Sequence, residues 1–600
     1  MKQRALYLLK FFVVTVLMFL VAKVVFMAYN HSDHDFSFAD VTQVIGHGLS
    51  LDFSTALYFL TVPVLLVIVS LWWCVPKWIF RVYYAIVALL FPLAFVADTS
   101  LYEFWQFKLD ASCLSYLATP TEAMASVSVG YILVRLLCLL LWGIAIYWVL
   151  DKVTPAFSLS KHRMVGTIVA LLFVPFIVIG IRGGFDESTT NIGQVYYSQN
   201  QFLNHSAVNP IFSFFASFEK TASNNVTYQF MDDTECQEIV QQLYPTKSVG
   251  TDTLLTSQTP NIIVILLEGC GGMFTEIGGR TDITPHLNRL AQEGVYFTNC
   301  YGNTWRTDRG TVCAWSGYPS FPTMSVMKMP SKSRTLPNIA RSLQEERGYA
   351  THYLYGGDIN FTNMRSYLIS GGFEQLTWKD DYTKEEQNTA QWGVRDDITF
   401  KTLHQLTATM RQPFLIGYST LSSHAPWDVP IHHFDDEVYN AFYYLDQCVG
   451  EFIEKLRKTP LWDNTLVVML PDHGIGYKGM NESNPLLNHI PMIWVGGAVK
   501  APRRVEQICN QTDLPATLLG QLGLDHSAYA FSRDVLSESY TYPFAIHTYD
   551  DGFTMIDSTS FVNYDFISDR AVTTKGSSSE RLVKQGKAIL QAATKDLNER

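Results

Sequence analysis

Five long apolar segments in the first third of the chain constrain its fold more than any other feature. They are Leu8–Tyr29, Leu51–Trp73, Trp78–Val96, Val127–Leu150 and Met164–Ile181. An α-helix crosses the hydrocarbon core of a bilayer with about 20 predominantly apolar residues, so each segment is expected to be a membrane span. The first segment is too long for the apolar region of a signal peptide, and no A-x-A-like cleavage site follows it. We therefore predict a five-span transmembrane domain over residues 1–182, with the buried helices of a soluble protein as the alternative.

The basic residues between these segments predict the orientation of the domain. They flank the start of the first segment and lie between the second and third and between the fourth and fifth: Lys2, Arg4, Lys10, Lys77, Arg81, Lys152, Lys161 and Arg163. The loops 30–50 and 97–126 carry only Lys108. Short cytoplasmic loops of membrane proteins are enriched in Lys and Arg. The N-terminus is therefore expected in the cytoplasm, and the chain after Ile181 is expected outside.

Charge and cysteine usage exclude two classes of site. The net charge is −11 and no Lys/Arg-rich block is present, which argues against a nucleic-acid-binding protein. The nine cysteines include no C-x-x-C pair, which disfavours a zinc-thiolate site. The cysteines beyond residue 182 are expected in a compartment that permits disulfides, but the sequence does not indicate which of them pair.

The remainder of the chain divides into a connector and a globular domain. Residues 183–258 are polar and aromatic with irregular periodicity, and we expect residues 200–218 to lie on the outer membrane surface or to pack on the outer domain. From 259 to 600, short apolar runs alternate with helix-length amphipathic segments, which is typical of an α/β domain with a mainly parallel central sheet. The predicted strands are 261–268, 350–358, 414–424, 465–473 and 490–497, and the predicted helices include 284–295, 335–347 and 437–458.

Side chains that bind metal ions stand at the ends of four successive predicted strands. They are Glu268, Asp358, His424 and the pair Asp472-His473, and His489 precedes the fifth strand. Ligands bind at the carboxyl ends of the strands in open parallel sheets. Any one of these residues could be a structural turn or core residue, but four in succession indicate a site.

The stretch "NTWRTDRGTVCAWSGYP" (303–319) supplies a candidate nucleophile. It is too charged for a core strand and too rich in Trp, Gly and Pro for an ordinary helix, and Thr307 alone would be a turn residue. Together with Glu268, Asp472 and His473, however, its hydroxyl completes a small site for one divalent cation. Such ligands suit Mn²⁺ first, with Zn²⁺ or Mg²⁺ as alternatives. A cation there would favour the threonine alkoxide and neutralise charge on a phosphorus or sulfur centre during displacement.

With these residues in view, the chain resembles the alkaline phosphatase/sulfatase superfamily, and within it the lipoteichoic acid synthase branch of membrane transferases. "TPHLNRLAQEGVYFTNCY" is similar to the stretch after the first metal ligand, "LPDHG" to the late Asp-His metal pair, and "QTDLPATLLGQLGL" to the segment beyond it. The resemblance implies that Glu268 is the first metal carboxylate, that Thr307 is both nucleophile and metal ligand, and that Asp472 and His473 complete the metal set.

The resemblance also implies where the substrate binds. The substrate-binding Asp and Arg of the family fall on Asp358 and Arg365, and an active-site His falls on His424. His489 resembles a further active-site His of phosphoethanolamine transferases.

Three departures from the synthases lie around this site. Gly356 stands where they carry a His, Asn363-Met364-Arg365 replaces a Trp-Asn-Arg triplet, and the residues beside the nucleophile, Arg306, Asp308 and Arg309, also differ. These differences leave the transferred head group open. The two arginines beside Thr307 are expected to bind an anionic group, because guanidinium matches phosphate and sulfate geometry.

The implied protein is a multi-pass enzyme of the bacterial plasma membrane. It would move a phosphoglycerol or phosphoethanolamine head group from a membrane phospholipid to an envelope glycan or lipid acceptor through a phosphothreonine intermediate. An extracytoplasmic phosphodiesterase that uses the same residues is the main alternative. A sulfatase is disfavoured because neither Thr307 nor Cys270 nor Cys313 fits a C/S-x-P-x-R-like motif. A non-catalytic scaffold is disfavoured because the metal set is intact.

Overall fold

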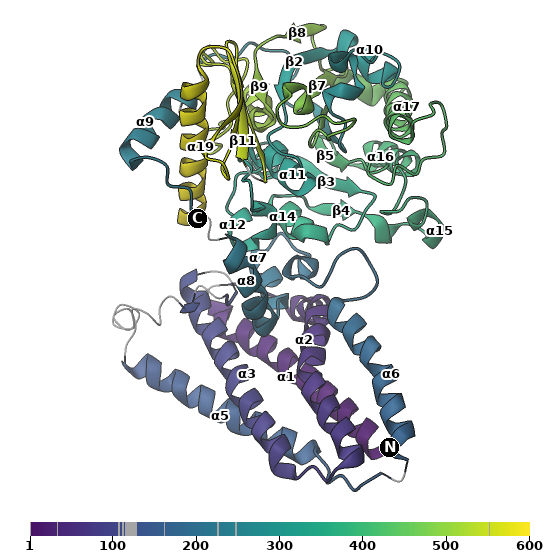
Figure 1. Ribbon diagram of the computed structural model, residues 1–600, viewed down its shortest axis with the longest axis vertical. Coiled ribbons are helices and arrows are strands. Elements are labelled where there is room, and N and C mark those ends of the chain that lie inside the picture. Colours follow the sequence, from purple (N-terminus) through teal and green to yellow (C-terminus); the bar gives the residue numbers. More distant parts are fainter. Residues whose placement is uncertain are drawn as a thin grey trace. The chain divides into compact units, whose positions relative to one another are not determined.

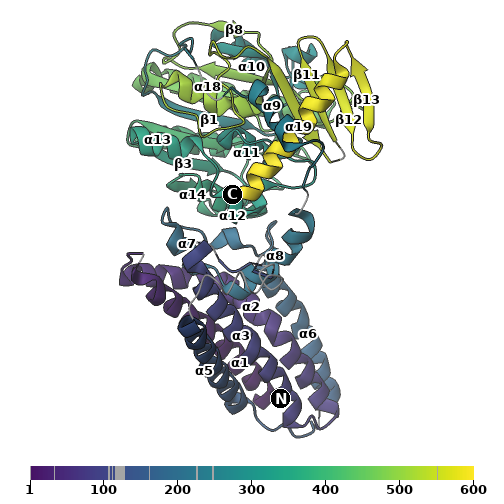
Figure 2. The same ribbon diagram turned by 90° about the vertical axis from the view of Figure 1, so that its left-hand side faces the viewer.

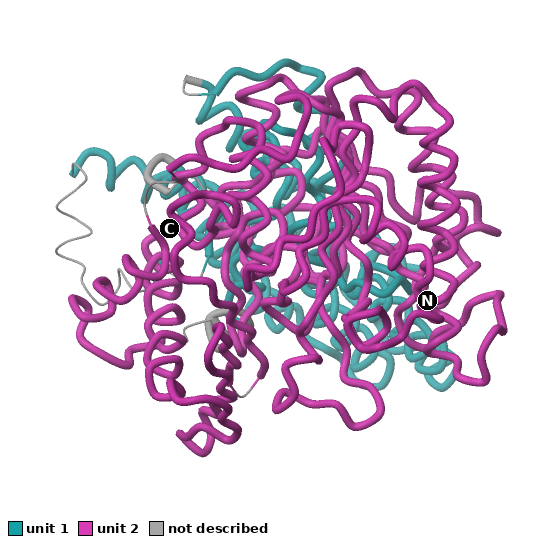
Figure 3. Tube along the Cα trace, turned by 90° about the horizontal axis from the view of Figure 1, so that it is seen from above, with its two compact units in different colours: residues 1–224 teal, residues 225–600 magenta. Residues whose placement is uncertain are grey.

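The computed structural model describes residues 2–32, 34–105, 108–110, 113–114, 129–160, 162–224, 227–245, 249–550 and 552–600. Contacts divide the chain into two compact units, Met1–Asn224 and Asn225–Arg600 (Figure 3). The predicted connector 183–258 is therefore shared between the two units. Lys161 and residues 115–128, on which parts of the predicted loops and of the fourth span fall, lie outside the described residues.

The first unit is a helical bundle. Its helices are α1 (Lys2–Tyr29), α2 (Phe38–Trp72), α3 (Lys77–Trp105), α5 (Val129–Val153), α6 (Arg163–Arg182), α7 (Gln201–Ala207) and α8 (Pro210–Asn224). Among the described residues, five helices are long and apolar enough to cross a membrane, namely α1, α2, α3, α5 and α6. The prediction of five apolar helices is confirmed.

Helix α2 begins well before the apolar segment Leu51–Trp73 that predicted it. Ser37 caps its N-terminus, accepting from the Asp40 amide while the Asp40 carboxylate accepts from the Ser37 amide. The added residues, 38–50, precede Asp52, whose carboxylate lies 2.5 Å from the Lys23 ammonium group of α1, with both side chains buried. A buried charge is tolerated when it is paired and hydrogen-bonded. Hydropathy alone therefore placed the start of this helix too late.

Residues 200–218 pack on the helical bundle, which is the unit that contains them. Asn209, between α7 and α8, donates to Asp52 at 2.9 Å, and His205 hydrogen-bonds the Tyr102 hydroxyl at 2.9 Å. Lys108, the one basic residue of the loops predicted outside, pairs with Asp98 in the same unit. Its charge is thus neutralised within the protein.

The second unit is built on a nine-stranded sheet in the order β4-β3-β5-β1-β6-β7-β2-β8, with β9 beside β2 (Figures 1 and 2). Its strands are β1 (Asn261–Leu267), β2 (Val295–Tyr301), β3 (Ala350–Tyr355), β4 (Gln375–Thr377), β5 (Phe414–Ser419), β6 (Thr465–Pro471), β7 (His489–Val495), β8 (Arg503–Val505) and β9 (Cys509–Asn510). Neighbours are parallel except at β7, which is antiparallel to β6 and β2. The predicted mainly parallel sheet is confirmed.

Helices cover both faces of this sheet, and others pack elsewhere in the second unit. They are α9 (Asp233–Leu243), α10 (Pro285–Glu293), α11 (Thr307–Ser316), α12 (Pro330–Ser333), α13 (Ile339–Arg347), α14 (Met364–Ser370), α15 (Lys384–Gln387), α16 (Asp396–Thr409), α17 (Glu437–Arg457), α18 (Leu514–Gln521) and α19 (Ser579–Glu599). The segments predicted as helices form α10, α13 and α17.

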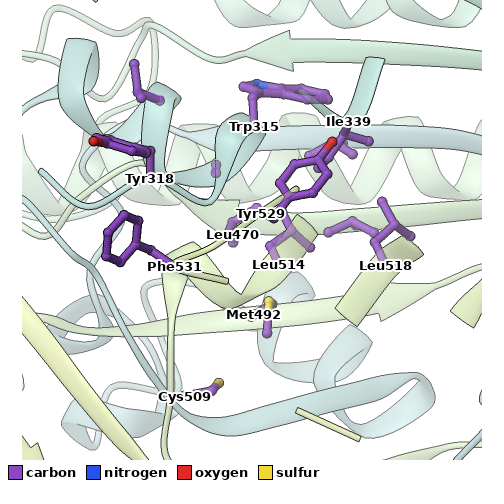
Figure 4. Close-up of a cluster of buried hydrophobic side chains, with 14 of the residues drawn as sticks. Trp315, Tyr318, Ile339, Leu470, Met492, Cys509, Leu514, Leu518, Tyr529 and Phe531 are labelled. Carbon is purple, nitrogen blue, oxygen red and sulfur yellow. The ribbon is translucent and has the colours of Figure 1, made fainter. Parts of the chain in front are cut away.

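Alternation along β1 divides the core into two clusters. Ile262, Val264 and Leu266 face a cluster with α11, α13 and α18, whereas Ile263 and Ile265 face a cluster with α10, α16 and α17. Successive side chains of a strand point to opposite faces, and a sheet that is covered on both faces is apolar throughout. Figure 4 shows the first cluster, where Trp315 of α11 lies near Leu514 and Leu518 of α18.

The chain after β9 forms a separate antiparallel sheet that the sequence did not predict. It consists of β10 (Phe544–Tyr549), β11 (Gly552–Asp557), β12 (Phe561–Asp565) and β13 (Arg570–Lys575), and α19 packs on it. Its strands are short and carry many polar residues, so no apolar run marks them. Helix α9, from the predicted connector, lies beside α19, where Gln591 accepts from the Phe230 amide at 2.8 Å.

Two strands, β3 and β5, end three and five residues earlier than predicted, which changes how the site residues are held. β3 ends at Tyr355 and β5 at Ser419, so Asp358 and His424 lie in loops after the strands. The loop after β5 leaves the sheet because the buried Asp396 carboxylate accepts from the amides of residues 421 and 422. Because β7 is antiparallel to β6, its first residue, rather than its last, lies at the edge where β6 ends.

Candidate active site

The register of β1 and β6 brings two carboxylates to one place. The strands are parallel, and the last paired residues are Leu267 and Pro471, so Glu268 and Asp472 follow directly at the same edge. Leu266 and Leu470 face the cluster that contains α11. By the period of two, Glu268 and Asp472 point to that same face. Both side chains are buried, at 7% and 1% exposure.

Helix α11 delivers the third component, and the interpretation that the stretch 303–319 is unsuited to a helix was wrong. The helix begins at Thr307 and ends before Gly317, whose φ of +59° is the left-handed conformation that glycine favours at a helix end. Trp315 is fully buried against the sheet. The unusual composition reflects tertiary packing: the small and aromatic residues fit a helix that is buried along nearly its whole length.

Four functional groups meet at this point. The Thr307 hydroxyl donates to Glu268 Oε2 at 3.0 Å and lies 3.4 Å from His473 Nε2. His473 Nε2 lies 3.4 Å from Glu268 Oε1 and 3.6 Å from Asp472 Oδ2. The four predicted metal-site residues are thus close together, although they come from three separate segments of the chain.

Burial and mutual charge shift the pKa values of these groups. Burial acts to raise the pKa of Glu268, but the hydrogen bond and charge of His473 bring it down to about 2. Burial raises the pKa of Asp472 to about 7, and the negative charge of Glu268 adds to this shift. Burial opposes protonation of His473, yet the charges of Asp472 and Glu268 raise its pKa to about 10. The two buried carboxylates therefore favour the binding of a positive charge at this site.

The ligand atoms fit a small divalent cation. One atom from each of Glu268, Asp472 and His473 lies within 4.8 Å of the others. Asp472 Oδ1 accepts from the backbone amides of Gly269 and His473, whereas the buried Oδ2 has no hydrogen-bond partner among the residues that the structure describes. His473 Nδ1 lies 2.9 Å from the Gly474 carbonyl, which only accepts, so Nδ1 carries a proton and Nε2 faces the cluster. An unsatisfied buried carboxylate oxygen is what a metal site requires.

Gly310 sets the distance between α11 and the end of β6. A Cβ added at this glycine would lie 2.1 Å from the Asp472 carbonyl oxygen. The helix can therefore approach the metal strand only because residue 310 has no side chain, and this approach places Thr307 beside Glu268.

We expect Gly310→Ala to lower both stability and activity. Overpacking of this kind costs about 1–3 kcal/mol, and a displacement of about 1 Å at a reacting group can lower the rate about 100-fold. Thermal unfolding and turnover measure the two effects. Gly302→Ala is the matched control, because its Cβ would meet no atom closer than 3.7 Å. Wild-type stability and activity in Gly310→Ala would show that this contact does not position Thr307.

A glutamine that sequence reasoning missed connects the same two segments. Gln511 donates to the carbonyls of Pro471 and Asp472 at 3.0 and 2.7 Å, and its oxygen accepts from the Asn303 amide at 3.3 Å. Asn303 in turn donates to Asn510 at 2.7 Å. Gln511 lies in the "QTDLPATLLGQLGL" segment that carried part of the family resemblance, but its partners are backbone groups distant in sequence, which no local pattern reveals.

The two residues that the resemblance assigned to substrate binding lie together. Asn360 bridges them: its amide nitrogen donates to Asp358 Oδ1 at 3.1 Å, and its oxygen accepts from Arg365 Nε at 2.7 Å. The Arg365 guanidinium lies 4.8 Å from the centre of the Trp378 ring. This arrangement orients a cation and an anion on the loop after β3.

Tyr355, the last residue of β3, is a second residue that was missed. It shares a face of the sheet with Tyr353, which belongs to the α11 cluster. Burial and then the negative charges of Glu268, Asp358 and Asp472 hold the pKa of Tyr355 well above its usual value. Its hydroxyl therefore stays protonated and can donate a hydrogen bond at the site. The sequence signal that could have identified Tyr355 is the alternation of side chains along β3, which places it on the same face as Tyr353.

The two predicted histidines differ in what they contact. His424 is half-buried, and its Nδ1 lies 2.8 Å from the Ala425 carbonyl. His489 hydrogen-bonds the Thr298 carbonyl through Nε2 at 2.8 Å, and burial lowers its pKa. Among the described residues, no hydrogen bond joins either histidine to the metal-site cluster, and His489 uses one ring nitrogen to join β7 to β2.

The two arginines beside Thr307 contact protein groups. Arg309 is buried and donates to the Pro322 carbonyl at 2.9 Å, and its guanidinium lies 5.4 Å from the Trp305 ring. Arg306 is exposed, and its guanidinium lies 4.4 Å from the centre of the Trp305 ring. Among the described residues, no hydrogen bond or ion pair joins either arginine to the metal-site cluster.

The fold and site can now be compared with known proteins. Residues 260–524 match the sulfatase family model. The second unit resembles the crystal structure of a protein in the alkaline phosphatase superfamily from Vibrio parahaemolyticus, at a TM-score of 0.54 and 27% identity, covering 62% of this chain and 98% of that one. It also has the fold of the lipoteichoic acid synthase LtaP from Listeria monocytogenes, at a TM-score of 0.51 and 19% identity, with the same coverage.

Curated relatives are similar over part of their length. Lipoteichoic acid synthase 2 of Bacillus subtilis is 28% identical over 314 residues, which are 47% of this chain and 48% of that protein. A lipoteichoic acid synthase of Staphylococcus aureus is 25% identical over 375 residues, 56% of this chain and 57% of that protein. The chain thus spans about half the length of the curated relatives it matches.

Proposed function

We propose that this chain, which carries a sulfatase-family domain with an alkaline phosphatase/sulfatase-like fold, is a membrane phosphotransferase. Its donor would be a membrane phospholipid, and it would transfer a phosphoglycerol or phosphoethanolamine head group to an envelope glycan or lipid acceptor. The observation that carries the proposal is the Thr307 hydroxyl at 3.0 Å from the Glu268 carboxylate, beside Asp472 and His473. The lipoteichoic acid synthases among its relatives support the same class of reaction.

The first half-reaction breaks the bond between phosphorus and the diacylglycerol oxygen. Thr307 Oγ attacks the phosphorus and gives up its proton, for which His424 is the proposed acceptor, because the Glu268 carboxylate, with a pKa of about 2, holds that proton only in a hydrogen bond. The head group becomes a phosphothreonine ester, and diacylglycerol leaves after its oxygen takes the proton from His424. A divalent cation held by Glu268, Asp472 and His473 would favour the threonine alkoxide and neutralise charge on the phosphoryl oxygens.

The second half-reaction restores the threonine. A hydroxyl of the acceptor attacks the phosphorus, the bond to Thr307 Oγ breaks, and that oxygen regains a proton. Asp358 and Arg365 are the proposed head-group ligands, since Asn360 holds them side by side. The Tyr355 hydroxyl is placed to donate to a phosphoryl oxygen, because the surrounding carboxylates keep it protonated. If water replaced the acceptor, the same residues would act as a phosphodiesterase.

Product analysis tests this proposal. The purified full-length protein is added to vesicles that contain labelled phosphatidylglycerol or phosphatidylethanolamine, with Mn²⁺ or Zn²⁺. We expect labelled diacylglycerol, and a head group that joins an added glycan or lipid acceptor. Release of the head group into water alone, with acceptors present, would indicate the phosphodiesterase instead. If protein that has bound metal releases diacylglycerol from neither lipid, the transferase proposal is wrong.

The proposed orientation places the N-terminus in the cytoplasm of a bacterium and the second unit outside. Two thiols of the first unit test it: Cys74 is exposed between α2 and α3, and Cys113 is partly exposed in the loop after α3. The six cysteines of the second unit are buried and free.

In single-cysteine variants, we expect a membrane-impermeant maleimide to label Cys113 in intact spheroplasts and Cys74 only after permeabilisation. The two residues control for each other, since they lie on loops that alternate in side. The reverse pattern would place the second unit in the cytoplasm, and Lys77 and Arg81 outside.

A further inference from the structure

A cavity of about 780 Å³ lies within the helical unit, among α2, α3, α6 and α8. Most of its wall is apolar, with Phe59, Val62, Val178, Ile211 and Phe212 among the lining residues. It has one charged lining residue, Arg182, together with the hydroxyls of Thr189 and Thr190. An apolar cavity with a few convergent polar groups is the usual form of a ligand site.

The charged group lies at one end of the cavity. Arg182 is the last residue of α6, and Thr189 and Thr190 follow it in the chain. The other lining hydroxyls include those of Thr55 and Tyr83, which donate to backbone carbonyls. The lining residues of α2 run from Thr55 to Val62, which corresponds to about 10 Å along a helix axis, or a third of the roughly 30 Å hydrocarbon core. The cavity therefore carries its charge at one end of a mostly apolar wall.

Arg182 is available for an anion. It is half-buried, and its Nη1 donates to the Gly184 carbonyl at 2.9 Å. Among the described residues it has no ion pair. Its remaining N–H groups form the planar fork that matches phosphate oxygens. The Thr190 hydroxyl donates to the Ile181 carbonyl at 3.1 Å, so the hydroxyl oxygen can still accept a hydrogen bond from a ligand.

Helix α8 forms one wall of the cavity and also exposes aromatic side chains. Ile211, Phe212 and Phe215 line the cavity, and Phe215 and Phe218 are 53% and 43% exposed. Aromatic side chains are enriched at membrane interfaces. An amphipathic helix with exposed phenylalanines beside an apolar cavity indicates an occupant that enters from the bilayer rather than from water.

We propose that this cavity binds a membrane phospholipid, with an acyl chain among α2, α3, α6 and α8 and the phosphate against Arg182. A phospholipid carries both an apolar chain and an anionic group at the depth where α6 ends. All lining residues of the cavity belong to the first unit, and the proposal does not rest on the proposed transfer reaction.

Photocrosslinking tests the site in the full-length protein. The protein is placed in phosphatidylcholine nanodiscs that contain a phosphatidylglycerol with a diazirine in one acyl chain, and labelled peptides are mapped by mass spectrometry. We expect saturable labelling of the peptides that contain Phe59 and Phe212, and competition by unlabelled phosphatidylglycerol. Ala216→Trp, which fills the cavity from α8, should abolish the saturable labelling. Leu172→Trp is the matched control, because this α6 side chain is 64% exposed and does not line the cavity.

Arg182→Gln tests the phosphate contact, and its result does not depend on whether the protein tolerates a tryptophan at position 216. Loss of a charge-assisted hydrogen bond should weaken labelling by about tenfold, whereas a diazirine diacylglycerol, which lacks the phosphate, should label wild type and variant equally weakly. Labelling spread evenly over the lipid-exposed helices, or unchanged by both Ala216→Trp and Arg182→Gln, would overturn the proposal. Diacylglycerol labelling as strong as that of the phospholipid would overturn the phosphate contact.

Discussion

Thr307→Ala is expected to abolish diacylglycerol release, with a loss of at least about 10³-fold. The substitution removes only the hydroxyl that attacks phosphorus. Because Thr307 Oγ makes hydrogen bonds to Glu268 and His473 alone among the described residues, the fold should persist. Turnover of labelled phospholipid measures the loss, and thermal unfolding confirms that the variant is folded.

Thr307→Ser is the matched control, because it keeps the oxygen and loses only a methyl group. We expect it to retain measurable turnover. Thr311→Ala is a second control on the same helix, since its hydroxyl donates to the Thr307 carbonyl and not to the site. Thr307→Ala with wild-type turnover would show that another residue, or water, attacks phosphorus.

Asp472→Asn is expected to remove both metal binding and activity. The side chain keeps its shape and the acceptor that receives the Gly269 and His473 amides, but the buried Oδ2, which has no hydrogen-bond partner within the described part of the chain, is replaced by an uncharged NH₂ group. A metal ion contributes several kcal/mol to stabilising charge in such a reaction, so turnover should fall by on the order of 10³-fold or more.

Metal content provides a readout that does not depend on catalysis. We expect about one divalent ion per wild-type chain by elemental analysis, loss of that ion and of activity in EDTA, and recovery on adding Mn²⁺. Asp463→Asn, on the exposed segment before β6, is the control and should bind metal normally. Asp472→Asn that binds metal as tightly as wild type would contradict the assigned site.

The metal-site carboxylates could be predicted because their positions follow from backbone periodicity. An apolar strand that is buried on both faces is visible as a run such as "NIIVILL", and the first polar residue after it lies at the sheet edge. Glu268 and Asp472 both have this position, and the parallel pairing of β1 with β6 brings them to the same edge of the sheet. His473 follows Asp472 directly. For these residues, local sequence determines three-dimensional position.

The remaining parts of the site depend on contacts that are distant in sequence. Gly310 is in a helix because α11 must approach the Asp472 carbonyl, and composition alone argues against that helix. Gln511 binds backbone groups of β6, and any glutamine has the same local signature. Arg309 was expected to bind an anion, but its burial and its bond to Pro322 depend on a neighbouring loop.

The helical unit shows the same division. Apolar length predicted its five long helices, yet the start of α2 was missed because residues 38–50 are less apolar than the segment that follows them. The antiparallel sheet β10 to β13 left no apolar run to detect. A hydropathy pattern identifies single apolar segments, but it does not show which strands pair in a sheet or which charged residues pair across the fold.

Trapping the covalent intermediate tests the central claim most directly. The full-length protein is mixed with donor phospholipid and metal but without acceptor, quenched in acid, digested, and analysed by mass spectrometry. We predict an added phosphoglycerol or phosphoethanolamine mass on Thr307, absent from Thr307→Ala, and lost when acceptor is added before the quench. Diacylglycerol release with no added mass on the peptide that contains Thr307, at times shorter than one turnover, would contradict the phosphothreonine mechanism.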